Sequence, residues 1–281
     1  MSSSALSGKR VGDFAATFIF RTPYRSFGLD GSAFFYKFAV MTEKMTAIVL
    51  DVTKHSDRHD IVSVFSRLRG RISFLSPAGS GKAAALRRSR LLPLSVIESD
   101  IHFRATTELQ RLGTFSLARV WTDIYFHPVK QLIALFLSEF LNRLLRASMP
   151  DEGLWHYIVD SLTLLDNMET GVSDFHITFL ASLLPFVGIQ PDSTLYAPGM
   201  VLNMQAGVFT DRIPPHRDYL SGDEARVAAT LCKLNFSNAP ALRLNGNLRH
   251  RILEGMLRYY GIHYPGTSNL RSLSVIHDLF H

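Results

Sequence analysis

The sequence predicts an α+β fold, with an antiparallel sheet or small barrel in its N-terminal part and a helical domain after it. Five apolar runs of strand length lie between residues 47 and 109, and charged or turn-like breaks separate them. This spacing leaves no room for crossover helices, which favours antiparallel pairing. After Leu109, apolar residues recur at steps of three and four, the period of buried helical faces.

The five predicted strands are Ala47–Thr53, His59–Ser66, Arg71–Ser76, Leu91–Ile97 and His102–Leu109. In His59–Ser66 apolar and polar residues are mixed, so we expect one buried and one wet face, as in an antiparallel sheet. Pro77 and the Gly79-Ser80-Gly81 turn end the third strand, and we expect a mobile basic loop over Gly79–Arg90.

Positive charge is concentrated on this same stretch. Residues 54–90 include nine basic and two acidic residues, which gives a local charge of +7, more than the +6 of the whole chain. A small basic barrel with a pI near 9.5 points to a polyanion, most often nucleic acid. A solvated loop that is merely basic is the alternative. The candidate contacts are Lys54, Arg58, Arg67, Arg69, Arg71, Lys82, Arg87, Arg88 and Arg90.

Residues 76–83 resemble a phosphate-binding Walker A motif, but two of the four fixed positions of the motif are not matched. Ser76 replaces a glycine and Ala83 replaces the Mg²⁺-binding serine or threonine. The chain has one cysteine, Cys232, no Gly-x-Ser-x-Gly elbow, and histidine pairs without metal-site spacing. We therefore expect no catalytic activity, no metal and no cofactor. No apolar run is long enough for a membrane span, so we expect a soluble cytoplasmic protein.

The helical part begins at Pro128, a residue suited to the first helical turn. A Pro/Gly-rich stretch over Gln190–Gly222 predicts a long ordered excursion rather than a helix. Gly261 is the expected stop of the fifth helix. The predicted helices run from Pro128 to Met149, and over Gly153–Met168, Asp174–Val187 (with Pro185 near its end), Asp223–Lys233, Asn247–Tyr260 and Ser268–His281.

Residues 1–44 differ from the rest in being rich in serine and having no regular period. Three interpretations remain open: an organellar transit peptide, a secretory signal, or an upstream artefact with translation starting at Met41 or Met45. We favour the third, in which case the segment would be disordered.

Four segments in this order resemble the bacterial recombination mediator family RecO, over residues 45–281. The segments are Ile48–Leu50 leading into Asp60–Phe65 and Gly70–Phe74; the basic turn Ala78–Lys82, with Pro93 in the strand that follows; Phe179–Asp192; and Arg251 to His263 with Arg271–Ile276. The last segment is similar to the tail of RecO proteins from the Bacteroidetes lineage. The chain departs from members that carry a four-cysteine zinc module, and Pro185 departs from the family's third helix.

The resemblance implies an OB-fold of five strands over residues 45–112 and an all-helical domain over 113–281. It implies a bacterial, nucleoid-associated protein that binds single- and double-stranded DNA, anneals complementary strands and contacts the mediator RecR. It also implies contact with the C-terminal tail of single-stranded-DNA-binding protein and assistance in loading RecA. Our candidates for meeting that acidic, aromatic-ended tail are Arg249, Arg251, Arg258, Tyr259 and Tyr260, although ordinary helix packing explains the tyrosines equally well.

Two rival functions stay open at this point. One is an RNA-binding OB protein, which a preference for structured RNA would favour. The other is a non-catalytic interaction adaptor, which an absence of nucleic-acid binding at low salt would favour. Stacking aromatics are scarce in the predicted barrel, namely Phe65, Phe74 and Phe103, so we expect binding dominated by phosphate charge and strongly dependent on salt.

Overall fold

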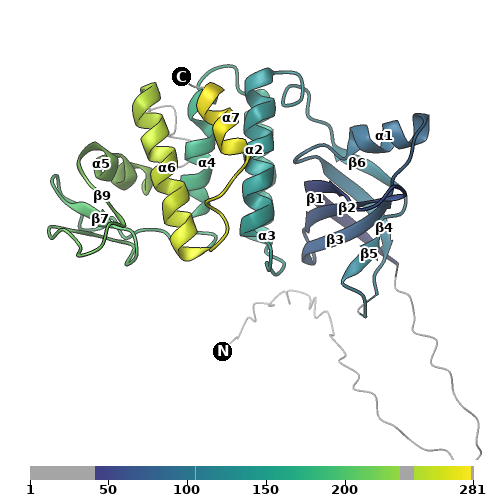
Figure 1. Cartoon of the computed structure of the whole chain (residues 1–281), viewed down its shortest axis with the longest axis horizontal. Helices are drawn as coiled ribbons and strands as arrows, with labels where there is room; N and C mark the ends of the chain where they lie inside the picture. The colour runs from purple at the N-terminus through teal and green to yellow at the C-terminus, as the bar shows by residue number, and fades with distance from the viewer. Residues whose placement is uncertain (1–41, 105, 235–243, 280–281) are drawn as a thin grey trace, which may run out of the picture. The chain divides into compact units, whose positions relative to one another are not determined.

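The computed structural model of the chain describes residues 42–104, 106–234 and 244–279 (Figure 1). Its first part is a six-stranded sheet in the order β5-β3-β2-β1-β4-β6. Neighbouring strands are antiparallel except β3 and β5, which are parallel. The longest strand, β1, pairs with both β2 and β4, and the register shifts at Val49/Asp51 of β1 and at Val96/Ile97 of β4 bend the sheet towards an OB-like barrel. The strands are β1 (Thr42–Lys54), β2 (His59–Ser66), β3 (Gly70–Pro77), β4 (Val96–His102), β5 (Leu109–Arg111) and β6 (Phe115–Arg119).

The first three predicted strands are found, but the last two and the count of five are wrong. The predicted strand Leu91–Ile97 overlaps β4 only at its end, because Pro93 lacks an N–H for the ladder and Leu94 has a φ of 62°. The predicted strand His102–Leu109 is mainly a loop. Strand β6 extends the sheet beyond residue 112.

Strand β1 is buried on both faces, since the barrel interior lies on one side and a helical core on the other. Ala47 and Val49 belong to the barrel interior. Ile48 and Leu50 belong to the helical core, whose helix α2 (Pro128–Leu144) donates from Ser138 Oγ to the carbonyl of Leu50. The predicted wet face of His59–Ser66 is therefore wrong, because the second half of β2 is buried throughout.

The predicted basic loop is a helix, α1 (Lys82–Arg90), and this corrects the loop expected over Gly79–Arg90. Three consecutive alanines followed by leucine and arginines favour a helix strongly enough to outweigh the preceding Gly-Ser-Gly turn. Arg87, Arg88 and Arg90 lie in its last turn, where the helix dipole favours positive charge. The helix buries none of its residues.

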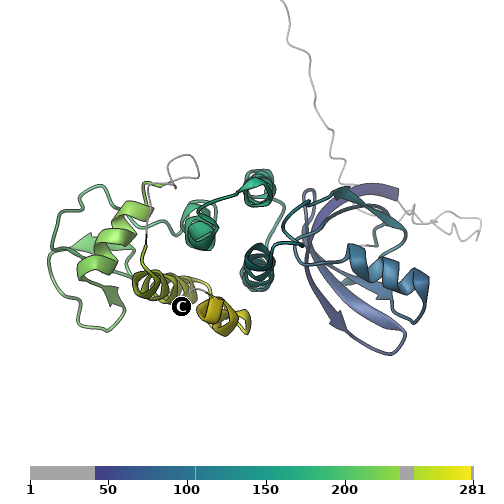
Figure 2. The same ribbon diagram turned by 90° about the horizontal axis from the view of Figure 1, so that it is seen from above.

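Helix α2 begins at Pro128 as predicted, and the second helix, α3 (Glu152–Asn167), is capped by Asp151, whose Oδ1 accepts from the Leu154 N–H at 2.8 Å. A short 3₁₀ turn, η1 (Val172–Asp174), leads into α4 (Phe175–Leu183), which ends two residues before Pro185. In Figure 2, α2, α3 and α4 are seen nearly end-on, so their axes run roughly side by side.

The C-terminal part is not all-helical, which is the second correction to the predicted fold class. The Pro/Gly-rich excursion contains a small antiparallel sheet of order β8-β7-β9, formed by β7 (Val201–Asn203), β8 (Val208–Thr210) and β9 (Tyr219–Leu220). Strands of two or three residues are too short to reveal a period of two in the sequence. Helix α5 (Gly222–Leu231) follows this sheet.

Helix α6 (Gly246–His263) continues past Gly261, so the predicted stop is wrong. A Cβ at Gly261 would lie 3.1 Å from the Cβ of Ser268, which shows that this glycine serves a close approach of two segments. The last helix, α7 (Ser272–Leu279), is fixed to α2 by Glu139, whose carboxylate accepts from the backbone N–H groups of Arg271 and Ser272.

The expectations for residues 1–44 fall outside the described residues, apart from Thr42–Lys44, which form the start of β1 and pair with β4. Among the residues that the structure describes, no helix is long and apolar enough to cross a membrane.

Candidate nucleic-acid interface

The nine predicted basic contacts lie in two groups, at opposite ends of β3. The first, here the α1 group, comprises Lys54, Arg58, Lys82, Arg87, Arg88 and Arg90; the second, the hairpin group, comprises Arg67, Arg69 and Arg71. His59 pairs with Pro77 at one end of the β2–β3 ladder and Ser66 with Gly70 at the other. An eight-residue strand spans roughly 25 Å, so the structure does not bring the nine side chains together.

The α1 group is electrostatically unbalanced. Lys54 forms an exposed ion pair with Asp57 at 3.1 Å. Within the described parts of the chain, the other five members have no carboxylate within ion-pair distance. Arg87 donates to the carbonyl of Gly113 at 3.2 Å and Arg88 to that of Gly79 at 2.8 Å. These contacts fix the two guanidinium groups without cancelling their charge.

The hairpin group is largely neutralised by the fold. Arg67 forms an ion pair with Glu152 at the start of α3, and this contact lowers the pKa of the Glu152 carboxyl. Arg69 binds Glu43, with Nε 2.9 Å from Oε2. Sequence reasoning could not foresee either pair, since the partners are 85 and 26 residues away.

Arg71 bridges the barrel and helix α2 rather than facing solvent freely. Its Nη1 donates to Ser73 Oγ and its Nη2 to Asn142 Oδ1, both at 2.8 Å. Burial lowers the pKa of Arg71, the charge of Asp51 opposes this, and the charge of Arg146 adds to it. Two arginines therefore approach one another where the barrel meets α2.

Two aromatic rings on the barrel surface lie beneath arginines. The guanidinium of Arg69 lies 3.9 Å from the ring centre of Phe103, and that of Arg87 lies 5.1 Å from the ring centre of Phe115. Both rings are partly exposed, whereas Phe65 and Phe74 are fully buried. Phe103 is thus the one predicted aromatic that is accessible from solvent.

Sequence reasoning missed Phe115 and Arg111. Arg111 is exposed and opposes Leu75 at the α1 end of β3, so it extends the α1 group. The alternation of Phe115 and Leu117 with polar residues was an available signal for a strand carrying a surface aromatic.

The five candidates for peptide contact occupy different faces of α6. Tyr259 and Tyr260 are core residues whose hydroxyls donate to the carbonyls of Ile189 and Leu180, each at 2.7 Å. Arg249 binds Asp174 at 2.7 Å and Arg251 binds Glu224 at 3.0 Å. Arg258 donates to the carbonyl of Tyr219 at 3.2 Å. It also lines a groove of about 380 Å³ beside α7.

No group of three or more His, Cys, Asp or Glu side chains with metal-site geometry occurs in the part of the chain that the structure describes. Burial raises the pKa of the Cys232 thiol to about 11, and the charge of Lys233 opposes this only in part. The thiol is therefore protonated and weakly nucleophilic at neutral pH.

Comparison with known proteins matches both parts of the chain. The family model described as "Recombination protein O N terminal" matches residues 41–121, and "Recombination protein O C terminal" matches residues 126–273. A protein named "DNA repair protein RecO" from Bacteroides fragilis is 33% identical over 241 residues, covering 85% of this chain and 100% of the relative. One of the same name from Azobacteroides pseudotrichonymphae is 30% identical over 240 residues, with the same two coverages. Another, from Flavobacterium psychrophilum, is 26% identical over 243 residues.

Proposed function

The chain belongs to the recombination protein O (RecO) family of DNA repair proteins, and on that premise we propose that it binds DNA through the α1 end of its barrel. The observation that carries this proposal is the charge imbalance of the α1 group. Arg58, Lys82 and Arg90 have no carboxylate partner among the described residues, and Arg111 extends their surface. A phosphodiester backbone supplies the missing negative charge at regular intervals.

We infer an annealing activity from the same surface. The binding is dominated by phosphates, since Phe103 and Phe115 are the accessible rings identified on the barrel and each lies beneath an arginine. A surface that neutralises two backbones while leaving bases uncovered allows complementary strands to pair. In the cell this activity would assist RecA loading, together with RecR, at gaps covered by single-stranded-DNA-binding protein.

The test of DNA binding is fluorescence anisotropy of a labelled single-stranded oligonucleotide with the full chain, repeated across salt concentrations. Each phosphate contact contributes about −0.7 to the log–log salt slope for single strands, so the Arg87→Ala/Arg88→Ala/Arg90→Ala variant should flatten the slope by about 2. A matched control is Arg212→Ala/Arg217→Ala/Arg226→Ala, in and after the small sheet, which should leave the slope unchanged. Absence of binding, or equal slopes in both variants, would contradict the proposal.

We further propose that the tail of single-stranded-DNA-binding protein docks in the groove beside α7. Arg258 lines this groove together with the apolar residues Leu257, Ile262 and Leu273 and with Glu254, whose carboxylate lies 3.3 Å from His250 Nε2. This combination suits an acidic peptide with an aromatic end. The test is anisotropy of a labelled peptide of that kind: Arg258→Glu should abolish binding, and Arg226→Glu, on α5, should not. An unchanged affinity in Arg258→Glu excludes this groove.

A further inference from the structure

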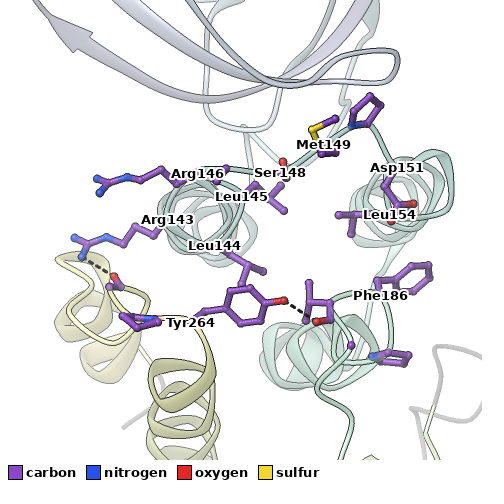
Figure 3. Close-up of a pocket in the computed structure, with 17 residues that line it drawn as sticks. Arg143, Leu144, Leu145, Arg146, Ser148, Met149, Asp151, Leu154, Phe186 and Tyr264 are labelled. Atoms are coloured by element: carbon purple, nitrogen blue, oxygen red, sulfur yellow. Dashed lines mark hydrogen bonds between the residues drawn. The ribbon is translucent and has the colours of Figure 1, made fainter.

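A cavity of about 900 Å³ lies where several helices end (Figure 3). The segments that follow α2, α4 and α6 line it, together with the start of α3. Pockets of roughly 300–1,000 Å³ commonly hold small ligands.

The three helices present their C-terminal ends to the cavity. A helix C-terminus carries the negative end of the macrodipole and several carbonyl groups without intrahelical partners. Three such ends disfavour a carboxylate deep in the cavity. They favour a neutral group over an anion, and nucleobases are neutral; the wall carbonyls of Val187 and Gly266 already accept from Tyr264 and Arg143.

The rim of the cavity on the barrel side is electrostatically positive, unlike the helix ends. Arg146 is exposed, and the described residues include no carboxylate within ion-pair distance of it. The hydroxyl of Ser148 is buried without a hydrogen-bond partner, as is Nε of the neighbouring Arg71. A phosphate at this rim would meet guanidinium groups and a hydroxyl donor, against two nearby carboxylates, Asp51 and the cavity-lining Asp151, whose Oδ1 already accepts from the Leu154 N–H.

The rim is continuous with the barrel surface. The backbone N–H of Arg71 donates to the carbonyl of Ser148 at 3.2 Å, and a Cβ on Gly70 would lie 2.4 Å from that same oxygen. The β2–β3 hairpin and the cavity rim are therefore in direct contact. A strand bound at this hairpin would therefore lie next to the rim of the cavity.

The cavity walls offer apolar surfaces to a base. Leu144 and Leu154 are buried wall residues, and Phe186 lies at the edge with 40% of its surface exposed. Its ring stacks on Tyr157, with centres 4.7 Å apart and planes inclined by 29°, which holds it in one orientation. A ring fixed in this way is a suitable partner for stacking.

We propose that the cavity receives one unpaired nucleobase of a bound single strand, while Arg146 and Ser148 hold the adjacent phosphate at the rim. This inference rests on the proposed DNA binding and adds to it a contact on the helical side. It assigns the deep part of the cavity to a neutral base and the rim to an anion, as the two electrostatic environments require.

The test uses two single strands of equal length, an oligothymidylate and a strand of abasic residues, with anisotropy on the full chain. Ala147 is exposed and lines the cavity, so Ala147→Trp fills the entrance without disturbing the core. This variant should weaken oligothymidylate binding about tenfold and leave the abasic strand unaffected, because one base–aromatic contact is lost. Ala206→Trp, in the turn between β7 and β8, is the matched control and should change neither affinity.

A second variant tests the rim separately. Arg146→Ala should weaken binding of both strands and reduce the salt slope by about 0.7, whereas Arg217→Ala should not. If Ala147→Trp does not fold, Arg146→Ala still tests the proposed site. Fluorescence of 2-aminopurine placed in the strand then reports whether one base is unstacked on binding.

The outcomes separate this inference from the proposed function. If Ala147→Trp weakens both strands equally, or neither, while the α1 variant lowers affinity, DNA binding stands and the base site is wrong. If an acidic peptide with an aromatic end binds, and Ala147→Trp blocks the peptide but not the oligothymidylate, the cavity is a peptide site and the inference is wrong. If the unmodified chain binds neither strand, both proposals fail.

Discussion

The guanidinium of Arg71, on β3, donates from Nη2 to Oδ1 of Asn142, on α2, at 2.8 Å. Asn142 Nδ2 lies 3.4 Å from Oδ2 of Asp51, on β1. One amide therefore links two barrel strands to the first helix of the helical domain. The contact stands beside Ser138, which donates to the carbonyl of Leu50 one helical turn earlier.

Asn142→Ala should lower the free energy of unfolding by about 1–3 kcal/mol, because a part-buried guanidinium loses an acceptor. Urea unfolding followed by circular dichroism measures this change. Gln205→Ala, which removes an exposed hydrogen bond to Asp218 in the small sheet, is the control and should cost less than about 0.5 kcal/mol. Equal costs would show that the amide does not link the two parts.

Gly70→Ala should destabilise the chain more than any other glycine substitution with a similar φ. Gly70 has a φ of +69°, and a Cβ there would lie 2.4 Å from the carbonyl oxygen of Ser148. Gly188 has a φ of +73° with no atom within 4 Å of an added Cβ. Gly188→Ala should cost about 1–2 kcal/mol through backbone strain alone, and Gly70→Ala clearly more. Similar melting temperatures for the two variants would contradict the close approach.

The free energy of unfolding should depend on pH in part through the carboxyl group of Asp166. Burial alone would raise the pKa of its carboxyl, but the backbone N–H groups of Thr122, Asp123 and Ile124 outweigh this and lower it. The pKa of Asp166 in the folded state lies below its ordinary value of 3.8. The ionised carboxylate therefore contributes its full share to the free energy of unfolding above that pH, and this share is lost as the pH falls through the folded-state pKa.

Asp166→Asn should therefore be destabilised relative to the unmodified chain by about 2–3 kcal/mol at pH 5–7, and the gap should narrow only below pH 4. Denaturant unfolding at a series of pH values measures the gap. Asp211→Asn, at an exposed site, should show no gap at any pH. A gap that narrows near neutral pH would exclude Asp166 as its source.

Phe115→Ala should weaken binding of an oligothymidylate and of an abasic strand to the same extent, since its ring lies beneath Arg87, packs against the barrel interior and positions the guanidinium rather than a base. Anisotropy at constant salt gives both affinities. Phe126→Ala, at a ring that is 80% exposed between β6 and α2, is the control and should change neither. A loss confined to the oligothymidylate would contradict this and show that Phe115 stacks on a base.

The helical domain was predictable where one pattern persisted over several turns. The apolar stripes after Pro128 and over Gly153–Met168 identified α2 and α3 to within a few residues. The predicted ends of helices and strands were wrong where one residue type is compatible with two different local structures. Gly261 served close packing against Ser268 rather than helix termination, and Pro93 with Leu94 delayed β4.

The sequence by itself determined the order of the parts, the basic character of residues 54–90 and the family, because charge and hydrophobic period are local properties. Tertiary structure decided which charges remain available. Arg67 and Arg69 are paired with Glu152 and Glu43, Arg71 joins two parts of the fold, and α1 keeps its charge unpaired. Ion pairing depends on distances of a few ångströms between residues far apart in the chain, and only the folded backbone sets those distances.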